Sequence, residues 1–245
     1  MDDIISLFVN ASRFAAQKEL KRFTRFLDPA QANDAKRIAR EHGVSFETWG
    51  GYDQAERVLG CFYPEFDEVD RGEYPLTCLS ARIPVKFCHV THRDILGAFM
   101  ALGLTRDSIG DIIIVMDRVY IFAHEQTAAY IAVSLTSAGK ASLSFEIMDG
   151  LPDIPEPNGT AFSSIVSSLR LDAVLAAAYR LSRSEAAELI RSGAVKVNHI
   201  PEDRVDFIVR EDSLLSLKGK GRVRFLSING TTKKQRIGIS LFRYE

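Results

Sequence analysis

The sequence has few cysteines and no hydrophobic run long enough to cross a bilayer. The apolar stretch at residues 112–116 is far shorter than the ~18 residues that a membrane-spanning helix needs. The three cysteines are an odd number without metal-site spacing, so we expect reduced thiols rather than disulfides. The acidic start Met1-Asp2-Asp3 lacks the basic segment that opens a signal peptide. These absences predict a cytoplasmic protein without a membrane partner.

No compositional bias excludes a globular fold. Of the 245 residues, 46% are hydrophobic and 26% are charged, which is typical of soluble proteins and not of disordered, collagen-like or disulfide-rich chains. At ~100–200 residues per domain, this length predicts one large domain or two to three small ones.

Charge is distributed unevenly along the chain, although the formal net charge is only -1. Residues 1–160 contain 16 Lys and Arg against 23 Asp and Glu, a net charge of -7. Residues 161–245 contain 15 against 9, a net charge of +6. A basic segment attached to an acidic body indicates a polyanionic partner, and nucleic acid is favoured over a merely solvated surface.

A proline-rich stretch separates the acidic and basic parts. Residues 151–160 contain three of the eight prolines, and proline both blocks helix continuation and stiffens the chain. Few core contacts can cross such a segment, so we interpret it as a linker. The predicted organisation is an N-terminal α/β domain at 1–75, a middle domain at 76–150, the linker at 151–160 and a basic domain with a C-terminal β extension at 161–245.

Hydrophobic spacing predicts three helices at the start of the chain. The first begins near the N-terminus, and a second is predicted at 18–27. A third follows Asp28-Pro29, because Asp is a good N-cap and Pro is favoured at the first helical position.

Strand and helix patterns alternate in the middle of the chain. Their order, β-α-β-β-α-β, is typical of ferredoxin-like and RNA-recognition folds. That fold serves many functions, so the order alone identifies none. The predicted strands lie at 76–83, 111–116, 119–123 and 142–148, and the helices at 91–102 and 126–137.

The basic part begins with two short helices and a strand. Apolar residues from Leu171 to Ala178 have the spacing i, i+3, i+4, i+7 of one helix face. Ser182 and Glu185 then form a capping box, in which each side chain bonds the other residue's backbone amide. An alternating strand at 194–198 completes a compact lobe.

Basic side chains lie off the apolar faces of this lobe and in two later runs, at 218–224 and 233–236, of which the first contains glycine. Arginine can bind phosphate bidentately, and glycine lets the backbone approach a phosphate closely. Apart from Phe225, no aromatic residue is interleaved with these cations, which favours backbone and shape recognition of folded RNA over stacking on unpaired bases. The candidate RNA-binding residues are Arg170, Arg180, Arg183, Ser184, Arg191, Lys196, Asn198, Lys218, Lys220, Arg222, Lys233 and Lys234, with Arg57, Arg93 and Arg106 as candidates for secondary RNA or partner contacts.

The segment His92-Arg93-Asp94 has the letters of a kinase catalytic loop but lacks its partner residues. That loop needs an Asn five residues after the Asp, and Phe99 stands there. A helix start explains the segment better, with Thr91 as the N-cap and Asp94 in the first turn. The five histidines show no ligand spacing, so we expect neither a metal nor a cofactor.

Together, the C-terminal motifs resemble an S4 RNA-binding domain. Two departures from that pattern affect turns, because His199 stands where glycine usually follows the Asn, and Glu211-Asp212 replaces the usual Gly-Asp. The resemblance is carried by Arg170-Leu171-Asp172-Ala173-Val174-Leu175, Ser182-Arg183-Ser184-Glu185-Ala186, Leu189-Ile190, Gly193 and Val195-Lys196-Val197-Asn198.

Motifs across most of residues 46–245 resemble the bacterial YlmH family, which has plastid and cyanobacterial relatives such as photosystem II S4-like proteins. The resemblance implies an α+β multidomain fold, with an N-terminal α/β unit, an RNA-recognition-like middle domain and a C-terminal S4 domain. The motifs are Trp49-Gly50-Gly51-Tyr52-Asp53-Gln54-Ala55-Glu56-Arg57, Thr91-His92-Arg93-Asp94-Ile95-Leu96-Gly97-Ala98, Leu104-Thr105-Arg106, Ile109-Gly110-Asp111-Ile112, Gly219-Lys220-Gly221-Arg222, Thr232-Lys233-Lys234 and Arg243-Tyr244.

The family resemblance also implies a function. It predicts a non-catalytic protein that binds the large ribosomal subunit, contacts rRNA and peptidyl-tRNA, and acts in ribosome-associated quality control. There such a factor holds a stalled peptidyl-tRNA while the nascent chain is extended. An association with cell division belongs to the same family, so quality-control and division proteins are candidate partners.

Two alternatives stay open at this point. Arg170-Leu171-Asp172 resembles a catalytic motif of pseudouridine synthases, which would make the chain an S4-targeted RNA-modifying enzyme. Those enzymes place Thr or Ser and then Gly after the Asp, whereas Ala173 follows here, so we favour Asp172 as a group that caps or braces a helix. The other alternative is a division-linked interaction scaffold, in which the acidic residues 1–160 bind a partner protein.

Overall fold

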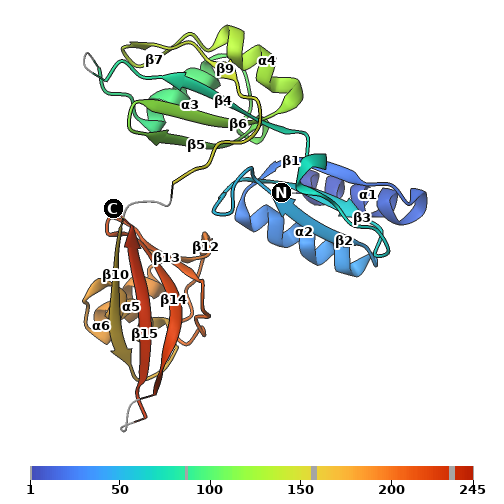
Figure 1. Ribbon diagram of the computed structural model, residues 1–245. Helices are drawn as coiled ribbons and strands as arrows, with labels where there is room; N and C mark the ends of the chain where they lie inside the picture. The colour runs from blue at the N-terminus through green and yellow to red at the C-terminus, as the bar shows by residue number, and fades with distance from the viewer. Residues whose placement is uncertain (1, 86–87, 156–158, 232–234, 245) are drawn as a thin grey trace. The chain divides into compact units, whose positions relative to one another are not determined.

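The computed structural model describes residues 2–85, 88–155, 159–231 and 235–244. The chain divides into two compact units, Met1–Ile154 and Pro155–Glu245, which are described separately below (Figure 1). Helices and antiparallel sheets occur in an N-terminal part, a middle part and a C-terminal part, and this confirms the predicted α+β class. Among the described residues, no helix is both long and apolar enough to span a membrane.

The N-terminal part is a three-stranded antiparallel sheet covered on one face by two helices. Apolar side chains of both helices pack against this face of the sheet. Asp28 caps the second helix as predicted, because its side chain accepts a 2.9 Å hydrogen bond from the backbone amide of Gln31. The elements are α1 (Asp2–Lys18), β1 (Arg22–Leu27), α2 (Pro29–Glu41), β2 (Ser45–Trp49) and β3 (Val58–Tyr63), in the sheet order β1-β3-β2.

The helix predicted at 18–27 is wrong, because α1 ends at Lys18 and most of that segment forms β1. Phe and Thr in this segment favour a strand, and pairing with β3 satisfies the backbone groups of both strands. The paired residues lie 31 to 40 positions apart along the chain, so local spacing could not reveal the pairing.

The middle part has the predicted β-α-β-β-α-β order, and its sheet order β5-β6-β4-β9 is antiparallel throughout. Thr91 caps α3 through the amide of Asp94, as predicted. Two predicted elements are longer than the observed ones. The helix predicted to reach residue 137 ends at Ser134, and the strand predicted at 142–148 is only two residues long. The elements are β4 (Leu76–Arg82), α3 (His92–Ala101), β5 (Ile109–Val115), β6 (Arg118–His124), α4 (Glu125–Ser134) and β9 (Glu146–Ile147), with a small hairpin of β7 (Ser137–Ala138) and β8 (Ala141–Ser142).

The N-terminal and middle sheets share a buried aromatic layer. Helices α3 and α4 cover one face of the middle sheet, while the opposite face packs against the N-terminal sheet. The Tyr52 ring stacks on the Phe122 ring with centroids 5.2 Å apart and an interplanar angle of 27°. Gly51 beside them has φ +99°, and a Cβ atom there would lie 2.4 Å from the Phe122 ring. This joint therefore requires glycine at position 51.

The C-terminal unit is a six-stranded antiparallel sheet with two helices on one face (Figure 1). Leu171, Val174, Leu175 and Ala178 are all 0% exposed, which confirms the predicted apolar helix face. The elements are β10 (Gly159–Val166), α5 (Leu171–Tyr179), α6 (Arg183–Arg191), β11 (Val195–Val197), β12 (Ile200–Pro201), β13 (Leu214–Leu217), β14 (Gly221–Thr231) and β15 (Ile237–Tyr244), in the sheet order β10-β15-β14-β13-β11-β12.

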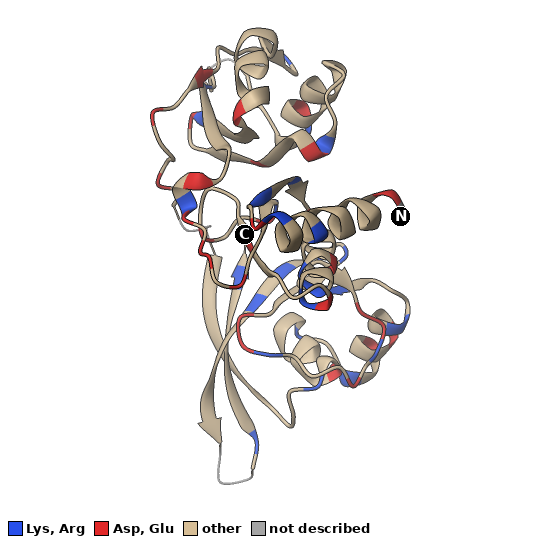
Figure 2. Cartoon of the chain, turned by 90° about the vertical axis from the view of Figure 1, so that its right-hand side faces the viewer, with Lys and Arg blue, Asp and Glu red and all other residues tan. Residues whose placement is uncertain are grey.

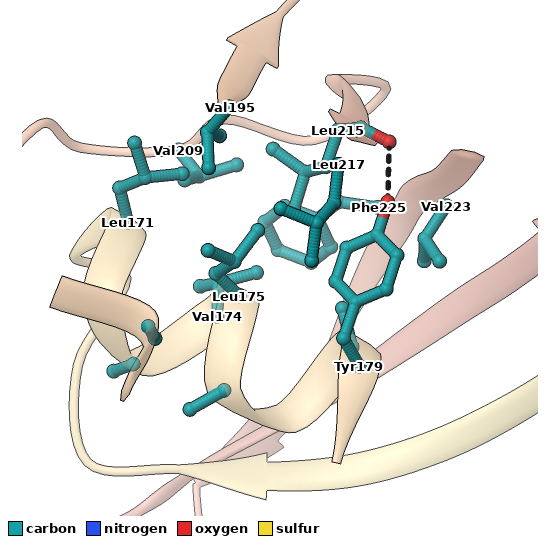
Figure 3. Packing of buried hydrophobic residues seen from close by; sticks show 14 of the residues in the cluster. Leu171, Val174, Leu175, Tyr179, Val195, Val209, Leu215, Leu217, Val223 and Phe225 are labelled. Carbon is teal, nitrogen blue, oxygen red and sulfur yellow. Dashed lines mark hydrogen bonds between the residues drawn. The ribbon is translucent and has the colours of Figure 1, made fainter. Parts of the chain in front are cut away.

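Tyr179 ties α5 to the sheet at the end of this core. Figure 3 shows its hydroxyl directed at the backbone of Leu215, and the hydroxyl lies 3.0 Å from that carbonyl oxygen and 2.9 Å from the carbonyl oxygen of Gly221. Burial raises the pKa of Tyr179 to about 12, so the group is a neutral donor at physiological pH. The helix face that carries the S4-like motif is thus fixed to β13 and β14.

Candidate nucleic-acid interface

A buried carboxylate joins the N-terminal ends of α5 and α6. The Asp172 side chain is only 9% exposed, and it accepts hydrogen bonds from Arg170 Nε at 3.2 Å and from Arg183 Nη2 at 2.5 Å. The arginine side chains are 40% and 53% exposed. Two cations from separate elements are therefore held beside one anion, with part of each guanidinium facing solvent.

The charge state of Asp172 follows from these contacts. Burial alone raises the pKa of a carboxyl group, but the hydrogen bonds and charges of Arg183 and Arg170 outweigh burial and hold the pKa of Asp172 below its usual value. The group is ionised at neutral pH and the cluster carries a net charge of +1. Each guanidinium has five N–H donors, so donors remain for phosphate oxygens.

The contacts of Asp172 confirm the expectation that it braces a helix. Its two carboxylate oxygens are used by Arg170 and Arg183, which gives the Arg-Leu-Asp motif a structural explanation without catalysis. Across the described residues, no three His, Cys, Asp or Glu side chains are grouped closely enough to hold a metal ion.

The connection between α5 and α6 presents two further candidates. Arg180 ends α5 in the left-handed conformation with φ +56°, and its side chain is exposed. Ser184 is exposed in the first turn of α6, next to the predicted capping box of Ser182 and Glu185, which the structure confirms with bonds of 3.2 and 2.8 Å. Arg191 lies exposed in the last turn of the same helix.

The two candidates in the β11–β12 hairpin differ in role, because Lys196 is a surface cation and the Asn198 side chain holds the turn. Lys196 is exposed between two buried valines. Asn198 and His199 form the two-residue turn with φ +48° and +67°, the conformation in which Asn-Gly is most common. Asn198 Oδ1 accepts a 2.8 Å bond from the Leu214 amide. The turn keeps its geometry without the usual glycine, and Asn198 joins it to β13.

Two candidate lysines lie on the β13–β14 turn. Lys218 and Lys220 are exposed, and the adjacent Gly219 and Gly221 have φ of +79° and +81°. The candidates Lys233 and Lys234 lie outside the described residues. Figure 2 shows in blue that Lys and Arg of the C-terminal unit occur on its helices and along its strands.

Two of the secondary candidates are half-buried in the other unit, where their guanidinium groups bond backbone carbonyl oxygens. Arg57 Nη2 donates to the carbonyl oxygens of Phe26 at 3.1 Å and Arg106 at 3.2 Å. Arg106 Nη1 donates to the carbonyl oxygens of Gly110 at 2.8 Å and Ile109 at 3.2 Å. Burial lowers the pKa of both side chains, that of Arg106 to about 10. Arg57 also donates through Nε to the Ile109 carbonyl oxygen at 3.3 Å, so it links β1 of the N-terminal sheet to β5 of the middle sheet, whereas the Arg106 guanidinium bonds the start of β5.

The third secondary candidate, Arg93, is exposed in the first turn of α3. Its position leaves the side chain open to solvent and so compatible with a partner. Direct RNA contact by these three arginines stays a prediction.

The candidate Arg222 is exposed on β14, and it belongs to a cluster that sequence reasoning missed. We call this cluster the aromatic platform, formed by Arg222, Arg224, Phe242 and Tyr244. The Arg222 guanidinium carbon lies 5.5 Å from the Tyr244 ring centroid, and Arg224 Nε donates a 2.8 Å hydrogen bond to Tyr244 Oη. The Phe242 and Tyr244 rings meet edge to face with centroids 5.1 Å apart. Phe225, the aromatic that the sequence places among the cations, is buried in the core instead.

The platform could have been found from one signal in the sequence. Arg222-x-Arg224 and Phe242-x-Tyr244 both have the period of two that places side chains on one face of a strand. Only the pairing of β14 with β15 shows that the two faces coincide.

Comparisons with known proteins match both units. Residues 70–150 match the family described as "Putative RNA-binding domain in YlmH", and residues 169–215 match the S4 domain. The chain is 36% identical over 233 residues to "Ribosome-associated protein quality control protein P2" of Bacillus subtilis (strain 168), covering 94% of this chain and 90% of that protein.

A solved structure, "Cell division protein ylmH from Streptococcus pneumoniae", is similar with a TM-score of 0.52 and 22% identity, over 60% of this chain and 90% of that one. At this identity the likeness shows the shared fold alone.

Proposed function

Because this chain belongs to the YlmH family of S4-domain RNA-binding proteins, we propose that it is a cytoplasmic, non-catalytic factor that binds the large ribosomal subunit through its C-terminal unit. Its contacts are the phosphates of rRNA and of peptidyl-tRNA, and its role lies in ribosome-associated quality control. The name of the Bacillus subtilis relative supports this role.

The observation that carries the proposal is the pair of arginines fixed by Asp172 within the S4-like motif. A fixed guanidinium loses less conformational entropy on binding than a free side chain, so its contact with phosphate is stronger. Exposed Arg180 at the end of α5 and Arg191 at the end of α6 add positive charge to the two helices that carry the pair. Each phosphate that they neutralise releases counterions, so binding must weaken as salt rises.

Co-sedimentation with ribosomal subunits over a salt series tests the proposal. The variant Arg170→Gln/Asp172→Asn/Arg183→Gln removes both cations without leaving a buried carboxylate unpaired. We expect its affinity for the large subunit to fall at least tenfold. The slope of log affinity against log salt should become shallower by about one for each phosphate that the variant no longer neutralises.

A matched variant controls for the loss of charge. Arg71→Gln/Asp53→Asn/Arg82→Gln removes two exposed arginines and one paired carboxylate from the other unit, and we expect its sedimentation to equal that of the wild type. The proposal is contradicted if the two triple variants and the wild type sediment alike.

A further inference from the structure

The C-terminal sheet has a second face, on the side that points away from α5 and α6. Val223 and Phe225 of β14 are 0% exposed and pack toward the helices. Because side chains alternate along a strand, Arg222 and Arg224 point to the other side. In Figure 1 the helices lie behind β10, β15 and β14, and this second face is turned toward the viewer.

Strand register brings the members of the aromatic platform together on this face. Arg224 pairs with Phe242 across β14 and β15, and residues directly opposite each other in a sheet share a face. Arg222 and Tyr244 are the next neighbours along the same strands, and the cation–π contact joins them. The platform thus combines two rings and two guanidinium groups.

A further cation extends the platform across the sheet. Ser216 pairs with Arg222 on one side and with Lys196 on the other, so Lys196, Ser216 and Arg222 form one row on the second face. Lys196 and Arg222 are exposed, whereas Arg224, Phe242 and Tyr244 are partly exposed. Positive charge and aromatic surface therefore occur side by side where solvent can reach them.

The backbone makes room for this arrangement at Gly159. A Cβ atom at that position would lie 2.5 Å from the Phe242 ring, so the ring lies across the glycine of the neighbouring strand. This packing restricts the Phe242 ring, which meets the Tyr244 ring edge to face. A rigid ring next to guanidinium groups is the arrangement on which nucleic-acid bases stack.

We propose that the aromatic platform binds unpaired RNA nucleotides by base stacking, while Arg222 and Lys196 hold the adjoining phosphates. This site lies on the opposite side of the sheet from the arginine pair at Asp172, which takes the backbone of folded RNA. The inference rests on the proposed function in that the RNA is ribosomal or transfer RNA, and it adds a second class of RNA element that the C-terminal unit recognises.

The test uses the full-length chain and two labelled probes in fluorescence anisotropy, an oligouridine of about twelve nucleotides and an RNA duplex of similar length. Tyr244→Leu keeps an apolar side chain but removes the ring. We expect it to weaken oligouridine binding by about tenfold and to leave duplex binding unchanged. Tyr244→Phe keeps the ring and loses the bond to Arg224, and it retains oligouridine binding. Tyr130→Leu removes a partly exposed tyrosine from α4 as the matched control.

The proposal is overturned if Tyr244→Leu binds oligouridine as tightly as the wild type, or if it loses both probes equally. Photo-cross-linking of the wild type to 4-thiouridine RNA keeps the inference testable even if that variant does not fold. Cross-links at Phe242 or Tyr244 support the inference, and cross-links confined to other residues contradict it. Failure of the proposed function looks different, because the wild type would then bind neither probe and would not sediment with ribosomal subunits.

Discussion

At the scale of single residues, Asp172 organises the candidate interface. It is a buried carboxylate between two partly exposed arginines, and such groups cost free energy unless they are paired and hydrogen-bonded. Here the pairing has a second effect, because it fixes the distance between two cations that come from different elements. The geometry offered to phosphates therefore depends on one anionic side chain.

Replacing Asp172 tests this dependence. We expect Asp172→Asn to lower the free energy of unfolding by about 1–3 kcal/mol at pH 7, since the charge-assisted bonds to both arginines are lost while the arginines keep access to water. Urea unfolding measures the change. Asp117→Asn removes the carboxylate of a solvent-exposed pair with Arg82 and is the control, for which no measurable change is expected.

The same variant has a defined pH dependence. The pKa of Asp172 is lower in the folded chain than in the unfolded one. The contribution of the ionised carboxylate to the free energy of unfolding is therefore fully present above the unfolded-state pKa of ~3.9, and it is lost as pH falls through the folded-state pKa. The stability difference between wild type and Asp172→Asn should therefore shrink below about pH 4. A difference that stays constant down to about pH 3 would contradict the assignment.

Residue-scale prediction from the sequence succeeded where the partners are close along the chain. The caps at Asp28, Thr91 and Ser182 use side chains three residues apart, and all three are present. The position of Arg57 depends on carbonyl groups of distant residues that folding brings close, and so does the aromatic platform. Residue types alone cannot separate a surface arginine from one that braces two sheets.

At the scale of elements, the joint between the N-terminal and middle sheets determines what the middle part can bind. The RNA-recognition fold stacks bases on aromatic side chains of its sheet. Here Phe122 and neighbouring side chains of that face are covered by the N-terminal sheet and by Tyr52. This part of the face is used for packing, which directs attention to the C-terminal unit as the site of RNA contact.

A glycine substitution at the joint, with a second one as its control, measures how strongly stability depends on close packing there. Gly51→Ala combines a positive φ with a contact of 2.4 Å to the Phe122 ring, and we expect it to lower the free energy of unfolding by about 2–4 kcal/mol. Gly97→Ala lies in α3 with open space around it and should raise stability by about 0.5–1 kcal/mol. Chemical denaturation of both variants measures these changes in the free energy of unfolding. Equal changes in the two variants would show that the joint tolerates a side chain at position 51.

Element types could largely be predicted from the sequence, whereas the pairing of strands could not. The order of strands and helices in the middle part and the apolar face of α5 were visible as local periodicity. The segment that forms β1 has a weak pattern, and its pairing with β3 overrides any helical tendency. The bounds of α4 and β9 were missed because short hairpins have little periodicity.

At the scale of the whole molecule, charge and fold divide at the same place. The unit Met1–Ile154 contains 16 Lys and Arg against 22 Asp and Glu, and Pro155–Glu245 contains 15 against 10. The C-terminal unit also has its own buried core, so it can be studied alone. An acidic partner on the same chain lowers the positive potential that attracts RNA.

This division predicts the behaviour of the isolated C-terminal unit. We expect residues 155–245 to bind rRNA fragments at low salt at least as tightly as the full chain, because the repulsion from the acidic unit is removed. The advantage should vanish at high salt, where that repulsion is screened. Filter binding across a salt series measures both species, and a folded fragment without affinity even in dilute buffer would contradict an RNA-binding role for this unit.

The Tyr52–Phe122 stack has a practical consequence for anyone who dissects the chain. The matched middle family begins at residue 70, so a fragment cut there keeps every strand of the middle sheet but loses Tyr52 and the whole N-terminal sheet. Phe122, Leu76 and Cys78 would then be exposed to solvent as part of a large apolar patch. Non-specific binding of such a fragment to RNA or to surfaces, and its self-association, would result from the truncation. A cut after residue 154 leaves this apolar face covered.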